Sequence, residues 1–409
     1  MHVLYLYQHF STPSGSTGTR AYEMARSLVA AGHKVTVVCG VVDTADTGVP
    51  ATGKRITHGE VDGFSVLKLD FPYSNKHSLK KRAWNFARYS VAASRIALTY
   101  DYDLLFATST PLTAAIPGIA TRLTRRKKPF VFEVRDVWPD LPIALGGLSN
   151  PVAIRALKLL EKLAYNCSHR TIGLAPGICE LIDQRRSRGS GQSALIPNGS
   201  DLELFIPQPD RVAGSPLRAV FTGTHGSANG LDAVLSCAQI LKDRGRTDIE
   251  IHMIGDGREK EALQQRAASQ RLTNCAFHPS MPKVELAKLL PTFDVGLMTL
   301  ANLPEFYYGT SPNKFFDYIA SGLPVINNYP GWLAGLIQEH DCGIAVEPEA
   351  PQVFADALEK LADEPELCRR YSANARNLAE DEFGREDLAS RFATTLEGAL
   401  TDFWESKQR

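Results

Sequence analysis

Two segments of the chain share one order of local signals, and this repetition constrains the fold more than any other feature. In the first segment an apolar run at 2–7 precedes a turn rich in glycine, serine and threonine, a helical stripe and a second apolar run, KVTVVCG. The second segment begins at residue 217 and reads strand, glycine turn, helix (231–243) and strand. This order is that of the βαβ unit of a parallel sheet. Two copies predict an α/β protein with two doubly wound, Rossmann-like domains.

The chain has 409 residues, which suffices for two domains with separate cores. The stretch 185–216 is rich in Gly, Ser and Pro and is the natural linker. We therefore expect one domain over 1–205, a second over 206–385, and a terminal amphipathic helix over 386–409. With no strand after it, that helix either caps the second domain or crosses back to the first.

Composition excludes several classes of protein. Lys+Arg and Asp+Glu number 45 each, so no global basic field indicates a nucleic-acid partner. The 7 cysteines are scattered singly, which favours reduced thiols in the cytoplasm over disulfides or a zinc site. The N-terminus shows no features of a signal peptide, and the most apolar run is broken by Pro111 and Pro117. A cytoplasmic protein that does not span a membrane is expected.

The stretch TSPNKFFDYIASGLPVI (310–326) predicts a short helix with Ser311 at the N-cap and Pro312 at the first helical position. Lys314 then lies in the first turn, where a cation opposes the helix dipole. One interpretation is a solvated pair of Lys314 with Asp317. The other is a bound anion: backbone N–H groups and Lys314 would hold a phosphate, and Asp317 would accept hydrogen bonds from ribose hydroxyls.

Three glycine turns, within 13–20, 222–230 and 253–263, follow predicted strands. They are expected at the carboxyl edge of a parallel sheet, where nucleotides bind in such folds. The first also places a cation, Arg20, in the first turn of a helix. None has the spacing GxGxxG or that of a P-loop, so a dehydrogenase is disfavoured. His9 and His225 adjoin these turns, where each could touch a phosphate or have only a local hydrogen bond. The residues that we expect around a bound nucleotide are Gly15, Gly18, Arg20, Gly223, His225, Gly255, Arg258, Ser311, Asn313, Lys314 and Asp317.

The stretch FEVRDVWPD (132–140) places charged side chains just after a predicted strand. Carboxylates beside an arginine often form a satisfied structural network. Their position at the sheet edge also favours contact with a substrate. We expect Glu133 and Asp136 to act with Lys314 in catalysis, and Arg135 and Asp140 to face a second substrate.

A helical run over 75–100 carries the cations Lys76, Lys80, Lys81, Arg82, Arg88 and Arg95, and TRRKKP (124–129) adds four more. Trp84, Phe86, Tyr89 and Val91 interleave with the first group. One interpretation is a solvated surface helix. The alternative is a peripheral contact of 75–100 and 124–128 with anionic lipid at the inner face of the plasma membrane.

Over almost its whole length the chain resembles the retaining GT-B glycosyltransferases of family 4. It is most similar to bacterial polysaccharide and O-antigen sugar transferases of the N-acetyl-L-fucosamine transferase type. The motifs that carry the resemblance are GSTGTRAYEMARSLVAAGHKVTVV, RDVWPD, IPNGSD, FTGTHGSANGLDAV, IGDG and, most specifically, SPNKFFDYIASGLPVI. The resemblance implies two domains facing a cleft, with the acceptor on the first, the nucleotide sugar on the second, and a C-terminal helix that crosses back.

The chain departs from this family at three positions. Asp317 stands at the second carboxylate of the family's Glu-x7-Glu motif, but Gly309 occupies the first. Thr224 and Asn229 stand where many members place an Arg and a Lys on the diphosphate. These losses put more of the phosphate charge on Lys314, with Arg258 or Arg20 as helpers.

The resemblance implies a hexosyltransferase that moves a sugar, with retention, from a nucleotide sugar to a saccharide acceptor in cell-surface polysaccharide biosynthesis. A UDP-sugar is the favoured donor and a polyprenyl-diphosphate-linked saccharide the expected acceptor. No DxD-like motif is present, so no metal or other cofactor is expected. Two alternatives stay open: a sugar-nucleotide epimerase of similar architecture, and a binding module for nucleotide sugars without turnover.

Overall fold

The computed structural model describes residues 1–50, 52–74, 77–124, 128–187, 191–208 and 216–408. The chain divides into two compact units, each with its own sheet. The first comprises Met1–Pro197, Gly309–Ser311 and Glu386–Arg409, and the second comprises Asn198–Tyr308 and Pro312–Arg385. The boundary expected near residue 205 falls inside the second unit. Each unit is described by itself below.

The first unit is built on an eight-stranded sheet in the order β3-β4-β2-β1-β5-β6-β7-β8. Its strands are parallel except for β3, which runs antiparallel to β4. The central strands are buried on both faces, which explains their continuous apolar sequences. The strands are β1 (His2–Leu6), β2 (Lys34–Val42), β3 (Ile56–Val61), β4 (Phe64–Tyr73), β5 (Leu104–Thr108), β6 (Phe130–Val134), β7 (Arg170–Gly173) and β8 (Ala194–Leu195).

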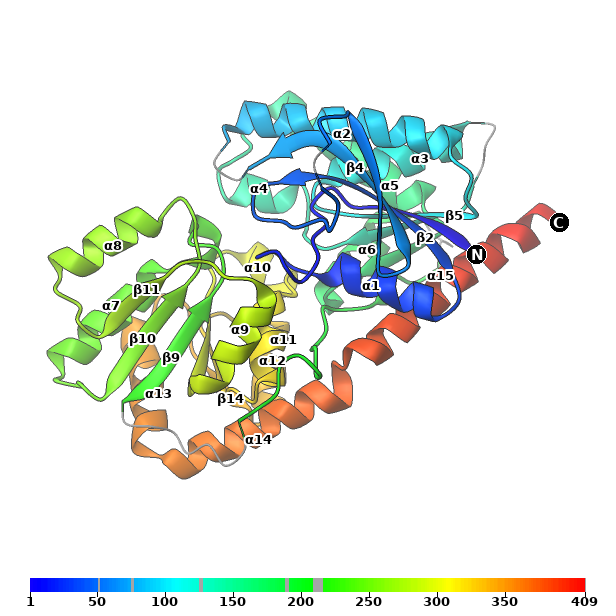
Figure 1. Cartoon of the computed structure of the whole chain (residues 1–409). Coiled ribbons are helices and arrows are strands. Elements are labelled where there is room, and N and C mark those ends of the chain that lie inside the picture. Colours follow the sequence, from blue (N-terminus) through cyan, green and yellow to red (C-terminus); the bar gives the residue numbers. More distant parts are fainter. Residues whose placement is uncertain (51, 75–76, 125–127, 188–190, 209–215, 409) are drawn as a thin grey trace. The chain divides into compact units, whose positions relative to one another are not determined.

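Helices cover both faces of this first sheet. On one face α1 and α15 pack their apolar stripes on strand side chains such as Val3 and Phe106, and α2, α3 and α5 lie on the other face (Figure 1). The helices of this unit are α1 (Arg20–Ala30), α2 (Leu79–Thr99), α3 (Ile116–Leu123), α4 (Asp140–Ala144), α5 (Pro151–Cys167), α6 (Pro176–Arg185) and α15 (Arg385–Gln408), with a 3₁₀ turn at Leu112–Ala115.

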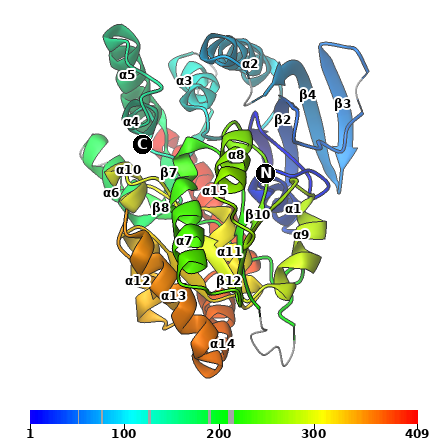
Figure 2. The ribbon, with the colours of Figure 1, turned by 90° about the vertical axis from the view of Figure 1, so that its left-hand side faces the viewer.

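The second unit contains a six-stranded, wholly parallel sheet in the order β11-β10-β9-β12-β13-β14. Its strands are β9 (Leu217–Thr222), β10 (Ile249–Ile254), β11 (Cys275–His278), β12 (Val295–Met298), β13 (Val325–Asn327) and β14 (Gly343–Ala345). The helices α7 and α13 lie against each other on its core (Figure 2). The helices are α7 (Asp232–Asp243), α8 (Lys260–Ser269), α9 (Lys283–Leu289), α10 (Pro304–Tyr308), α11 (Asn313–Ala320), α12 (Trp332–Glu339), α13 (Pro351–Asp363) and α14 (Pro365–Glu382), with 3₁₀ turns at Ser227–Asn229 and Leu290–Thr292.

The two doubly wound α/β sheets confirm the predicted fold class. The terminal helix packs Leu388, Phe392 and Leu396 into the core of the first unit, so it crosses back and does not cap the second. The antiparallel hairpin β3–β4 was not predicted, although Asp62 and Gly63 form the Asp-Gly turn that signals a hairpin. Among the described residues, every helix falls short of the length or the mean hydropathy that a membrane span requires.

Candidate donor site in the second unit

The predicted site helix is α11, and its start differs from the expectation. The helix begins at Asn313, and Pro312 is the N-cap residue, with no side-chain cap. Ser311 was expected at the N-cap and Pro312 inside the helix. Pro312 has an extended ψ of 130°, which places it before the first helical turn. The N–H groups of the first turn therefore lack a capping side chain, and Lys314 is the second helical residue.

The ammonium group of Lys314 reaches across to the turn that follows β9. Its Nζ donates a 2.8 Å hydrogen bond to Oδ1 of Asn229 and lies 4.0 Å from the ring centroid of Phe221. Within the described ranges it forms no ion pair with a carboxylate. Burial lowers the pKa of Lys314 to about 7. The site thus holds a partly buried cation at the positive end of a helix, without a negative partner.

The glycine turns after β9 and β10 press against each other beside this lysine. The N–H of Gly223 donates 2.9 Å to the carbonyl of Ile254, and a Cβ on Gly255 would overlap the carbonyl oxygen of Gly223. Nζ of Lys314 would lie 3.7 Å from a Cβ built on Gly223. Glycine at 255 therefore permits the close approach of two backbones, and Gly223 has a φ of 135°, which favours glycine.

His225 lies between these turns and is fully buried. Its ring packs 6.1 Å from Phe221 and 6.1 Å from Phe277, and neither ring nitrogen has a hydrogen-bond partner among the described residues. Burial, followed by the charge of Lys260, lowers the pKa of His225 to about 4. A neutral imidazole with two unsatisfied nitrogens is costly to bury, which makes this position a candidate for polar contact with a ligand.

Asp317 does not lie on a solvated helix face, as the helical spacing had suggested. Its carboxylate is buried, with Oδ1 3.7 Å from Nζ of Lys283 on α9. Lys283 also lies 3.9 Å from the carboxylate of Asp201. Burial raises the pKa of Asp317, and the charges of Lys283 and Arg385 oppose that rise. The solvated pair of Asp317 with Lys314 is therefore absent, and the partner of Asp317 is a lysine on another helix.

The other residues predicted at the donor near α11 and β10 are placed less distinctively. Asn313 begins α11 and is partly buried, whereas Arg258 is exposed in the loop after β10. Ser311 is buried directly before the helix.

The glycine loop of the first unit, with Gly15 and Gly18, precedes α1. A Cβ on Gly15 would overlap Oγ of Ser11 and crowd the backbone of Asp46, so a packing constraint within the first unit explains this glycine.

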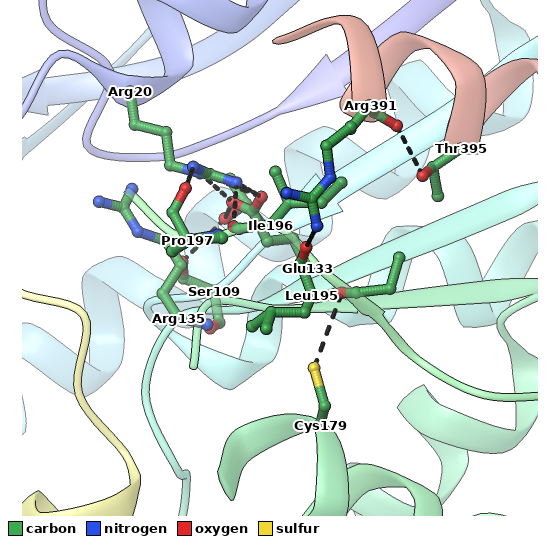
Figure 3. Close-up of polar contacts among 12 residues, drawn as sticks. Arg20, Ser109, Glu133, Arg135, Cys179, Leu195, Ile196, Pro197, Arg391 and Thr395 are labelled. Atoms are coloured by element: carbon green, nitrogen blue, oxygen red, sulfur yellow. Dashed lines mark hydrogen bonds and ion pairs between the residues drawn. The ribbon is translucent and has the colours of Figure 1, made fainter. Parts of the chain in front are cut away.

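Arg20 and Glu133 form a buried ion pair in the first unit (Figure 3). Nη2 of Arg20 lies 2.7 Å from Oε2 of Glu133, and both side chains are 1% exposed. The remaining guanidinium donors bind the carbonyls of Ile196 and Pro197, while Oε1 of Glu133 accepts 2.7 Å from Thr108. Each guanidinium nitrogen of Arg20 and each carboxylate oxygen of Glu133 thus has a partner within the first unit. The geometry favours the satisfied structural network over the donor contact predicted for Arg20 and the catalytic role predicted for Glu133.

The other charged residues of the FEVRDVWPD stretch diverge in their contacts. Asp136 accepts 2.6 Å from the hydroxyl of Thr110. Asp140, expected at the acceptor, forms an ion pair of 2.6 Å with Arg185. Arg135 stacks on the ring of Tyr7 at 5.0 Å from its centroid. Of these residues, Arg135 keeps a buried nitrogen, Nη1, without a partner among the described residues.

Two contacts of the site could not be anticipated from local patterns. Asn229 stood out only as the place of an expected cation, and its hydrogen bond to Lys314 joins residues 85 apart. Lys283 lies at the start of α9, and no sequence pattern had indicated that it belongs to the site. In the described part of the chain, no three His, Cys, Asp or Glu side chains group so as to hold a metal ion.

Two family models match the chain and together cover most of it. The model for the glycosyl transferase 4-like domain matches residues 15–199, and the model for glycosyl transferases group 1 matches residues 206–378. The first lies within the first unit but for two residues, and the second contains every strand of the second sheet, from Leu217 to Ala345.

Curated relatives align with part of their length. D-inositol 3-phosphate glycosyltransferase of Streptomyces griseus is 28% identical over 243 residues, which cover 56% of this chain and 48% of that protein. MMP alpha-(1->4)-mannosyltransferase of Mycolicibacterium hassiacum is 24% identical, with 51% and 49% covered. The chain thus spans about half the length of the curated relatives that it matches.

Solved structures are similar over nearly the whole chain. Sucrose-phosphate synthase from Thermosynechococcus elongatus superposes with a TM-score of 0.77 at 16% identity, covering 98% of this chain and 99% of that one. Anabaena HepE in complex with UDP-glucose gives a TM-score of 0.68 at 16% identity, with 97% and 100% covered. At such identities the likeness establishes the fold alone. The two family models show that the chain belongs to the glycosyltransferases of the GT4 type, and the solved structures show the GT-B fold.

Proposed function

We propose that the protein is a hexosyltransferase that moves a sugar, with retention, from a nucleotide sugar to a saccharide acceptor. A UDP-sugar is the favoured donor, and the acceptor is a lipid-linked saccharide of cell-surface polysaccharide biosynthesis. Lys314 carries the proposal, as a cation without a negative partner in the described chain at the N-terminus of α11. The complexes of HepE with UDP and with UDP-glucose support a donor of this class.

A diphosphate removes the electrostatic conflict at this helix end. Its oxygens would accept hydrogen bonds from the uncapped N–H groups of α11, and its charge would hold Lys314 in the ammonium form. The glycine turn at Gly223 leaves room for a phosphate to approach the backbone. His225 would supply a further polar contact, and Asp317 with Lys283 would face the ribose.

Catalysis in this proposal is the stabilisation of a leaving group. The bond between the anomeric carbon and the diphosphate breaks while the acceptor oxygen bonds to the same face of the sugar. The acceptor proton passes to the departing phosphate oxygen, so no protein nucleophile is required. Lys314 and the helix N-terminus stabilise the negative charge that grows on the diphosphate, and no metal ion is needed for that task.

A peripheral membrane contact through α2 belongs to the same proposal. Trp84 and Val91, seven residues apart and therefore on one side of the helix, are 65% and 55% exposed. Phe86 and Tyr89, which had been included in this face, are buried in the core instead. The helix contains no Asp or Glu, and its cations are Lys80, Lys81, Arg82, Arg88 and Arg95. A basic helix with exposed apolar side chains fits an anionic bilayer surface.

The second basic stretch, residues 124–128, adds less to this proposed membrane contact. Lys128 binds the carbonyl of Tyr102. Lys76 and residues 125–127 lie outside the described residues, so the part of the contact predicted for them stays a prediction.

Donor screening tests the proposal. The protein is incubated with UDP-, GDP- and dTDP-sugars, with and without a lipid-diphosphate-linked saccharide, and both nucleotide release and the sugar product are measured. We expect acceptor-dependent release of UDP and an elongated saccharide with the donor's anomeric configuration. An epimerised sugar nucleotide without release would indicate the epimerase instead. Binding of nucleotide sugar without any turnover would indicate a binding module.

A further inference from the structure

We propose that Arg82, Arg135 and His9 form a subsite in the first unit that binds a phosphate group of the acceptor. This inference rests on the proposed function, because it names the chemistry that the acceptor must carry. The three residues come from different elements: the first turn of α2, the segment after β6 and the segment after β1. Their side chains meet around a cluster of aromatic rings at the carboxyl edge of the first sheet.

Arg135 is a cation held in place by packing without a matched charge. Its guanidinium lies 5.0 Å from the ring centroid of Tyr7, and its backbone N–H donates 2.9 Å to Oγ of Ser109. Nη1 is buried with no hydrogen-bond partner among the described residues. The nearby carboxylates are already engaged, Glu133 with Arg20 and Asp136 with Thr110.

Arg82 is a second arginine that packs on an aromatic ring of this cluster and has a buried nitrogen without a hydrogen-bond partner among the described residues. Its guanidinium lies over Tyr73 at 5.6 Å, and its buried Nε has no partner in the described chain. The first turn of α2 also carries Lys80 and Lys81 and no carboxylate. Three consecutive cations at a positive helix end are unfavourable in the free protein, and a bound anion would relieve that conflict.

His9 joins the two arginines. Its ring lies 6.0 Å from Tyr7, the platform of Arg135, and 4.7 Å from Tyr73, the platform of Arg82. Burial lowers the pKa of His9 to about 4, and the charges of Arg135 and Arg82 both add to that effect. Both guanidinium groups therefore act on one small region, where a neutral imidazole can still form a hydrogen bond.

A phosphate group matches this arrangement better than a carboxylate or a neutral sugar. It has enough oxygens to accept from two guanidinium groups and an imidazole together, and stacked arginines present their planar donors in fixed directions. A phosphorylated sugar or polyol and a lipid-diphosphate-linked saccharide both provide such a group. The experiment therefore includes one probe of each kind.

The test measures binding by isothermal titration to the full-length protein and to the variants Arg82→Gln and Arg135→Gln. The probes are glucose 1-phosphate, a short-chain prenyl-diphosphate-linked N-acetylglucosamine, and UDP. We expect each substitution to weaken one or both phosphate probes about tenfold, a typical loss for a charge-assisted contact. UDP affinity should not change. Whichever probe binds more tightly to the wild-type protein identifies the source of the phosphate.

Matched control variants distinguish the loss of specific contacts from a general loss of positive charge and from unfolding. Arg155→Gln removes an exposed arginine of α5, outside the proposed membrane contact, and should leave all affinities unchanged. The variants Arg82→Lys and Arg135→Lys, with thermal midpoints measured in parallel, identify losses that come from unfolding. The subsite is overturned if neither phosphate probe binds the wild-type protein, or if Arg155→Gln weakens binding as much as Arg82→Gln. Arginine-dependent phosphate binding without UDP binding would leave the subsite standing and would instead contradict the proposed function.

Discussion

Nζ of Lys314 donates a 2.8 Å hydrogen bond to Oδ1 of Asn229, 85 residues earlier in the chain. Nδ2 of the same asparagine donates 2.7 Å to the carbonyl of Thr224. Thr224 and Asn229 are the two positions at which the family resemblance leads us to expect cations. Lys314 on α11 therefore places a positive charge beside the turn after β9, where those two cations are missing.

Removing this lysine should weaken the binding of a diphosphate selectively. We expect Lys314→Ala to reduce UDP affinity at least tenfold, because a charge-assisted contact to phosphate contributes about 1.5 to 3 kcal/mol. Uridine affinity should change little. Isothermal titration with both ligands provides the measurement, and Lys288→Ala, which removes an exposed lysine of α9, is the control. Equal losses for UDP and uridine would assign Lys314 a structural role.

The contact with Asn229 also predicts that the charge can be moved. In the double variant Asn229→Lys/Lys314→Ala, a cation returns to the position at which many family members carry it. Part of the UDP affinity lost in Lys314→Ala should be recovered, since the two side chains meet in the same place. If affinity did not recover although the thermal midpoint was unchanged, the positive charge would have to lie at the N-terminus of α11, and a lysine at position 229 could not replace it.

The depressed pKa of Lys314 predicts how donor affinity depends on pH. With a pKa of about 7 in the free protein, the side chain loses its proton as the pH rises above 7. A diphosphate binds the ammonium form, so UDP affinity should fall from pH 7 to pH 9, by up to about tenfold per pH unit. Lys314→Arg stays charged in this range and should bind UDP without that slope. A wild-type affinity as flat as that of the arginine variant would contradict the assignment.

Because Arg20 and Glu133 form a buried pair, we expect substitutions of either residue to lower the free energy of unfolding more than they lower the rate of sugar transfer. Glu133→Gln leaves the guanidinium without its counter-charge, and removing one partner of a buried pair costs about 3 to 5 kcal/mol. Urea unfolding of the single variants and of Arg20→Gln/Glu133→Gln should show that the double variant loses less than the sum of the single losses. If Glu133→Gln kept wild-type stability and lost sugar transfer, the catalytic role predicted for Glu133 would be reinstated.

Membrane contact through α2 should depend on its exposed tryptophan. Trp84→Glu is expected to reduce co-sedimentation with vesicles that contain anionic phospholipid, because it removes apolar area and adds a negative charge to a basic surface. Trp404, 53% exposed on α15, provides a control substitution of the same kind outside α2. Equal binding to zwitterionic vesicles, or an equal loss in Trp404→Glu, would argue against a specific surface on α2.

Local sequence patterns predicted the parallel βαβ units of the fold and the helix that carries Lys314. The apolar runs and glycine turns at residues 2 and 217 specify parallel βαβ units, since side-chain period and turn chemistry act over a few residues. Lys314 in the first turn of a helix was likewise visible as a local electrostatic conflict. The hairpin β3–β4 was also within reach, through the Asp-Gly turn at its tip.

Only the tertiary structure decided which side chains meet. Arg20 and Glu133 were both predicted to serve substrates, yet they lie 113 residues apart and neutralise each other in the core. A solvated pair of Asp317 with Lys314 was one of two interpretations of the helix, but Asp317 is buried and its partner is Lys283. Such pairings depend on strand order, register and helix packing, which place residues distant in sequence side by side. The charge of a residue is a property of the sequence, whereas the partner that satisfies that charge is a property of the fold.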